Sequence, residues 1–178
     1  MSTALMAGAP RRFTFTMMFL VLALAGCSQS EAARPKNHKT ITHEQAAARA
    51  EQLIRETVNE LTPRPKLEIY QPGSADAPCL DPTDGGSENR QVISRGYWLR
   101  GISRADNRSI GKQVLHLWKK KGDLITSTTK IGTDRPEIHG GSKPDDFLIA
   151  LESSDNGWLS IGATSPCIWP QGTPPPEK

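Results

Sequence analysis

Apolar residues recur at helical spacing between positions 43 and 61, with charged residues on the opposite side of the same turns. Thr42 and Gln45 form the pattern of a capping box just before this stretch. The sequence Thr-Pro-Arg-Pro at 62–65 ends it, because proline cannot continue a helix. We therefore predict a helix over 43–61. Its apolar face consists of Ala46, Ala50, Leu53, Ile54, Thr57, Val58 and Leu61.

A second helical pattern covers residues 104–121. Ser103 can cap its start, and Ile110, Val114, Leu117 and Trp118 fall on one stripe. Three lysines at 119–121 precede Gly122. Lysines are favourable at the C-terminal end of a helix, which carries a partial negative charge, and glycine readily adopts the left-handed conformation that ends many helices.

The remaining apolar segments predict strands. They are rich in β-branched and aromatic residues and lie at 66–70, 91–102, 124–131, 147–152 and 158–163. Asn156-Gly157 is a two-residue turn signal that favours a hairpin between the last two. Residues 71–90 are predicted as a long loop. The order helix, strand, strand, helix, three strands predicts an α+β domain, with a mainly antiparallel sheet and both helices packed on one of its faces.

The N-terminus has the pattern of an export signal. Arg11 and Arg12 precede an apolar run at 13–24, which is short for a bilayer crossing. The run ends in Leu24-Ala25-Gly26-Cys27, which resembles a lipobox, so we predict cleavage between Gly26 and Cys27 and lipidation of Cys27. A plain signal peptide and an uncleaved anchor are the alternatives, and the arginine pair leaves Sec or twin-arginine export open.

This interpretation divides the chain into four parts. Residues 1–26 are the signal, 27–41 the lipidated cysteine and a flexible tether, 42–169 the α+β domain, and 170–178 a disordered proline-rich tail. We expect a protein anchored by its lipid on the extracytoplasmic face of the cell membrane.

Composition and charge exclude several classes. With 36% hydrophobic and 23% charged residues, the chain is neither wholly disordered nor a multi-spanning membrane protein. Without Arg11 and Arg12 it has 20 basic and 19 acidic side chains, a formal net charge of +1. Nucleic acid is not an expected partner, since such binding needs clustered cations.

Two cysteines, Cys79 and Cys167, are left for the domain. Outside the cytoplasm an even pair favours a disulfide. A metal pair or a catalytic thiol is the alternative, but widely separated cysteines without regular histidines do not make a zinc site.

No sequence motif indicates catalysis, a metal or a cofactor. The four histidines are scattered, and His139 is expected in a solvated loop. The segment 81–85 has oxygen ligands near a glycine but not the spacing of a calcium loop. Tyr97 and Trp98 are candidate binding residues, because adjacent strand residues point to opposite faces and one aromatic should be exposed.

The closing segment Ser165-Pro166-Cys167-Ile168-Trp169-Pro170, together with the lipobox, resembles that of small uncharacterised lipoproteins of Streptomyces-like actinobacteria. The resemblance implies an envelope protein on the outer face of the cytoplasmic membrane, and it carries no active-site residues with it.

Two functions remain from these observations. The first is a non-enzymatic envelope module that binds a protein, a peptide or a small ligand near the membrane. The alternative is a small hydrolase or carbohydrate-active enzyme that uses acids such as Asp81, Asp84 or Glu152. A cleft with two carboxyl groups within roughly 10 Å would favour the enzyme.

The anchor makes a direct prediction. Cys27→Ser removes the sulfur that would carry the lipid, so the variant should lose metabolic labelling by a palmitate analogue and either be released from the membrane or remain unprocessed. Labelling equal to that of the wild-type chain would contradict the lipobox interpretation.

Overall fold

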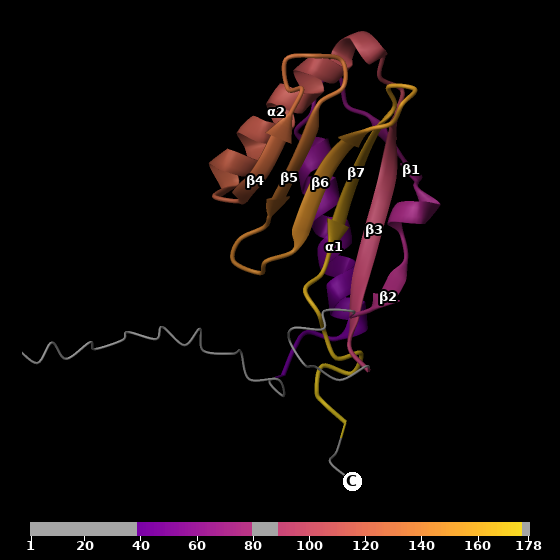
Figure 1. Cartoon of the computed structure of the whole chain (residues 1–178), viewed down its shortest axis with the longest axis vertical. Coiled ribbons are helices and arrows are strands. Elements are labelled where there is room, and N and C mark those ends of the chain that lie inside the picture. Colours follow the sequence, from indigo (N-terminus) through magenta and orange to yellow (C-terminus); the bar gives the residue numbers. More distant parts are fainter. Residues whose placement is uncertain (1–38, 80–88, 176–178) are drawn as a thin grey trace, which may run out of the picture. The chain divides into compact units, whose positions relative to one another are not determined.

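Seven strands, two α-helices and two short 3-10 helices make up the parts of the chain that the computed structural model describes, residues 39–79 and 89–175. In chain order the elements are α1 (His43–Asn59), β1 (Lys66–Ile69), η1 (Gln71–Gly73), β2 (Asp76–Pro78), β3 (Gln91–Arg100), η2 (Arg104–Asp106), α2 (Asn107–Lys121), β4 (Leu124–Thr129), β5 (Glu137–Gly141), β6 (Leu148–Ser153) and β7 (Leu159–Thr164) (Figure 1).

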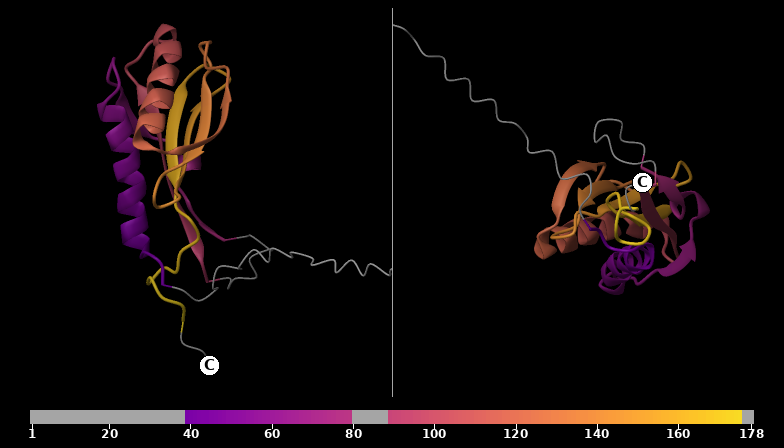
Figure 2. Two further views of the ribbon diagram at one scale, coloured as in Figure 1. Left: turned by 90° about the vertical axis from the view of Figure 1, so that its left-hand side faces the viewer. Right: turned by 90° about the horizontal axis from the view of Figure 1, so that it is seen from below.

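The strands form one sheet in the order β1-β3-β7-β6-β5-β4, with β2 pairing to β3 beyond the end of β1. The described strand pairs are antiparallel. Both helices lie on the same side of this sheet (Figure 2). The predicted α+β class, with an antiparallel sheet and helices on one face, is therefore confirmed. No described helix has the length and apolarity needed to cross a bilayer.

The helices begin and end where their sequence signals lie. Thr42 and Gln45 make the expected capping box, each side chain accepting a hydrogen bond from the other's backbone N–H. Ser103 and Asp106 cap η2 in the same way, so residues 104–106 form a 3-10 turn and α2 starts only at Asn107. Gly122 ends α2 in the left-handed conformation, with φ of +84°.

The hydrophobic core lies between the helices and the sheet. From the helices it takes Ala46, Ala50, Leu53, Ile54, Val58, Ile110, Val114 and Trp118. From the sheet and its connections it takes Ile93, Leu99, Ile138, Phe147, Ile149, Leu151, Leu159, Ile161 and Ala163. Trp118 donates its indole N–H to Thr57 Oγ1 at 3.0 Å, so α2 is joined to α1 without an unpaired polar group in the core.

Apart from shifts of a few residues at element ends, two strands and the C-terminal boundary of the domain differ from the sequence-based expectation. β2 lies inside the predicted loop, and β5 was not predicted at all, because the sequence Glu-Ile-His-Gly-Gly lacks the composition typical of a strand. Beyond residue 169, Pro170 and Gly172 accept backbone hydrogen bonds from His43 and Thr40 at 3.0 and 2.9 Å. The packed part of the chain thus continues to residue 172, while 176–178 lie outside the described residues.

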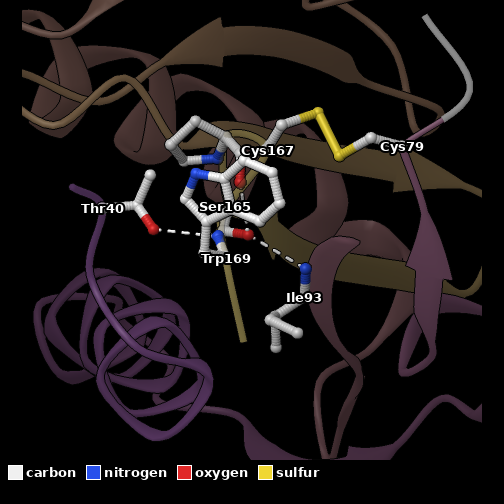
Figure 3. Close-up of a disulfide and its surroundings, with 7 residues drawn as sticks. Thr40, Cys79, Ile93, Ser165, Cys167 and Trp169 are labelled. Carbon is white, nitrogen blue, oxygen red and sulfur yellow. Dashed lines mark hydrogen bonds between the residues drawn. A yellow bond between two sulfur atoms is a disulfide. The ribbon is translucent and has the colours of Figure 1, made fainter. Parts of the chain in front are cut away.

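Cys79 and Cys167 form a disulfide, as the sequence predicted, with their Cα atoms 6.0 Å apart. Two hydrogen bonds surround it (Figure 3). Ser165 Oγ accepts from the Ile93 N–H at 2.9 Å, and Thr40 Oγ1 accepts from the Trp169 N–H at 2.9 Å. The C-terminal segment is therefore attached both to the start of β3 and to the chain that leads into α1.

Removing this disulfide should cost much of the domain's stability. It closes a loop between residues 88 positions apart, and such a loop restricts the unfolded chain by about 4–5 kcal/mol in the chain-entropy model. The Cys79→Ser, Cys167→Ser double variant should lose about that much in urea unfolding, and reduced wild-type protein should unfold at the same urea concentration as the variant. Two free thiols alkylated in the folded, oxidised protein would contradict the bond.

Candidate functional site

The face of the sheet opposite the helices carries unusually small side chains at its centre. We call it the open face. Strand register places Gly96 of β3 opposite Gly162 of β7, Gly162 opposite Ala150 of β6, and Ala150 opposite His139 of β5. Three of these four neighbouring positions therefore have at most one side-chain carbon, and the sheet surface is low there.

Larger and more polar residues flank this row on both sides. On one side the open face has Ser94, Thr164 and Leu148 in register, and on the other it has Trp98, Ser160 and Glu152. The Ser94 and Thr164 hydroxyls are 2.9 Å apart and hydrogen-bonded, while the Leu148 side chain is well exposed, at 64%. The open face is thus a shallow floor between two rows of taller side chains.

The connection between β1 and β2 forms a wall along one edge of this floor. The Tyr70 N–H donates to Gly96 O at 2.9 Å, and Ser74 Oγ accepts from the Gly96 N–H at 2.9 Å. This brings η1 so close that a Cβ on Gly96 would lie 2.9 Å from Gly73 O. Gly96 is therefore required by close backbone approach, one of the reasons for glycine inside a strand.

Floor and wall together enclose a cavity of about 600 Å³, open on one side, which we call the open-face groove. Such a volume lies within the range of small-molecule sites. The side chains that give it chemical character are Tyr70, Pro72, Ser94, His139, Leu148 and Glu152.

The charges of the groove are few. His139 Nε2 lies 3.9 Å from Glu152 Oε1, and among the described residues Glu152 supplies the one carboxylate that lines the groove. Arg95 borders the groove through its backbone position, but its guanidinium lies on the helix side, 3.4 Å from Asp76 Oδ1. Hydrogen bonds from His43 and Arg95 lower the Asp76 pKa. This ion pair is therefore separate from the groove.

An aromatic cluster adjoins the groove at the end of β3. Tyr70, which lines the groove, has its ring centroid 4.5 Å from that of Trp98, at an interplanar angle of 54°. The Arg100 guanidinium lies over both Trp98 and Trp158, at 5.3 and 5.0 Å from their ring centroids, and pairs with Glu68. The Arg100 guanidinium is attracted to the faces of both tryptophan rings.

The two aromatic residues singled out in the sequence lie on opposite faces. Tyr97 points to the helix side, where its hydroxyl donates to Glu51 Oε2 at 2.7 Å. Burial and the neighbouring Glu51 carboxylate raise the Tyr97 pKa. Trp98 lies on the open face, so of the pair it is the one beside the groove.

Several other predicted positions are placed differently or not at all. His139 was expected in a loop and instead lies in β5, facing the groove. The strand was not predicted because two glycines, which have little strand preference, follow this histidine. Gly26, Cys27, Asp81 and Asp84 lie outside the described residues. Within the described ranges no three histidine, cysteine or acidic residues gather as a metal site would require.

Sequence reasoning missed Tyr70 and the glycines of the floor. The signal for the floor was present, since Gly96 interrupts an otherwise β-branched and aromatic strand, and such a glycine marks a bulge or a close approach. Comparison with known proteins adds nothing to this geometry, as no family model and no curated protein matches the chain.

Gly96→Ala should destabilise the protein. The added methyl meets the η1 backbone, which cannot rotate away, so overpacking of about 1–3 kcal/mol is expected. Gly132→Ala is the matched control, because a Cβ there meets nothing within 4 Å and the residue's φ is ordinary. Urea unfolding should separate the two variants, and equal effects would contradict the close approach of η1 to β3.

Proposed function

We propose that this chain is a membrane-anchored, extracytoplasmic binding module of the cell envelope, and that the open-face groove is its binding surface. The observation that supports it most is the groove itself, a hollow of about 600 Å³ on a sheet face that neither α1 nor α2 covers. Leu148 at its rim is 64% exposed and offers an apolar contact to a ligand.

Two features support the extracytoplasmic location. The lipobox at 24–27 predicts an anchor on Cys27, and the Cys79–Cys167 disulfide suits an oxidising compartment. Neither feature depends on the groove, so location and binding surface are independent parts of the proposal.

The point at which the described chain begins also fits a binding role. The chain enters the domain at Thr40, beside Trp169 and near the start of β3. The aromatic cluster lies at the end of β3, where Trp98 and Arg100 are. At 3.4 Å per residue these two ends of β3 are about 30 Å apart, so the aromatic cluster lies at the end of β3 away from the residues at which the described chain begins.

A hydrolase remains the second candidate, because His139 and Glu152 lie 3.9 Å apart in the groove. Glycoside hydrolysis generally needs two carboxyl groups around the scissile bond. Among the described groove residues only Glu152 supplies one, and Asp81 and Asp84 lie outside the described residues. The geometry therefore supports binding better than hydrolysis.

Site-specific photocrosslinking in intact cells tests the binding surface. A benzoylphenylalanine in place of Leu148 would sit at the groove rim, and one in place of Ala48 would sit on the exposed side of α1. We expect a specific adduct from position 148 and none from position 48. Ala150→Leu, which places a larger side chain on the groove floor, should remove the adduct, whereas Ala48→Leu, the same change on α1, should not.

The result has clear alternatives. Equal adducts from both positions, or no adduct from position 148, would contradict the groove as the binding surface. So would an adduct from position 148 that Ala150→Leu leaves unchanged.

A further inference from the structure

The chemistry of the open-face groove restricts what it can bind. Its floor belongs to β3, β7, β6 and β5, and each of these strands is paired on both sides. Their backbone N–H and C=O groups are therefore used within the sheet. An extended peptide that binds by adding a strand needs an unpaired edge, so in the groove recognition has to come from side chains.

The groove's charge disfavours an anionic ligand. Glu152 is the carboxylate among its described side chains, and the Arg95 guanidinium lies on the other side of the sheet beside Asp76. A phosphate or carboxylate in the groove would meet a negative charge without a facing cation.

A purely apolar ligand would leave polar groups without water. The hydroxyl-bearing residues Ser94, Ser160 and Thr164 line the groove on either side of the floor, and His139 and Glu152 line it as well. Covering such groups with hydrocarbon costs free energy unless the ligand offers hydrogen bonds in return. The ligand should therefore both donate and accept hydrogen bonds.

We propose that the open-face groove binds a short oligosaccharide that carries no acidic groups. This inference rests on the proposed binding function. Sugar hydroxyls both donate and accept, and so match serine and threonine hydroxyls, the His139 imidazole and the Glu152 carboxylate. The C–H face of a sugar ring packs on an aromatic ring, and Tyr70 supplies that ring at the groove wall.

Tyr70 is held in place before any ligand arrives. Its ring contacts Trp98 on one side, and Gly73 lies so close that a Cβ there would come 2.8 Å from Tyr70 Cδ1. A ring fixed in this way loses little freedom on binding, which favours affinity. Between β3 and His139 on β5 there are three strand spacings, about 14 Å, the span of a di- or trisaccharide rather than a single sugar.

The test uses the purified full-length protein in a detergent without a sugar headgroup, followed by its tryptophan fluorescence. The uncharged probes are maltotriose, mannotriose and chitotriose. Trigalacturonate is the anionic probe. We expect saturable binding of at least one uncharged trisaccharide and weaker binding of trigalacturonate.

The variants identify the site. Ala150→Leu should abolish binding, while Ala48→Leu should leave it unchanged. Tyr70→Ala should weaken it by roughly tenfold or more, as removal of a central aromatic contact does, and Tyr70→Phe should restore it. If Tyr70→Ala proves unfolded by circular dichroism, Ala150→Leu decides the location.

No saturable binding of any uncharged trisaccharide would overturn the inference, as would tighter binding of trigalacturonate or binding unaffected by Ala150→Leu. The crosslinking experiment separates this failure from that of the binding function. If position 148 gives protein adducts but no saccharide binds, the oligosaccharide inference is wrong and the groove still stands as the binding surface. If neither adducts nor saccharide binding are observed, both the oligosaccharide inference and the proposed binding surface are wrong.

Discussion

The pairing of β3 with β7 joins the two halves of the sheet. The first half consists of β1, β2 and β3, which come early in the chain, and the second half is the β4–β7 meander. Three contacts reinforce this pairing at the end where β3 begins and β7 ends. They are the disulfide, the hydrogen bond from the Ile93 N–H to Ser165, and the β-bridge between Gln91 and Ile168. Because the floor of the groove consists of residues from both strands, the groove exists only when they are paired.

The groove illustrates a conflict between strand stability and function. Glycine inside a strand weakens it, through lost entropy and a missing side chain, yet Gly96 and Gly162 lie opposite each other at the centre of the sheet. Gly96 is required by the approach of η1. Gly96 makes room for η1, which carries the wall, and Gly162 with Ala150 keeps the floor of the groove low beside that wall. The apolar residues of the same strands face the helices and supply the stability that the open face lacks.

Elements with strong local signals were predicted well. The capping box at Thr42, the apolar stripe of α1 and Gly122 after α2 each act within a few residues, so they are visible in a short window of sequence. β5 was missed because its stability comes from its neighbours. Its sequence, with His139 and two glycines, has little strand preference, and hydrogen bonds to β4 and β6 on either side keep it extended. The same error placed His139 in a loop and hid its proximity to Glu152.

The sequence by itself determined the class of the fold, both helices, most strands and the pairing of Cys79 with Cys167, since each depends on local periodicity, caps or a count of cysteines. Only the tertiary structure decided the strand order, in which α2 carries the chain from β3 to β4 at the far edge of the sheet before the meander returns to β3. That order depends on contacts between distant residues, which leave no periodic trace in the sequence. The groove follows from the order, because Gly96 lies beside Gly73, 23 positions before it, and beside Gly162, 66 positions after it.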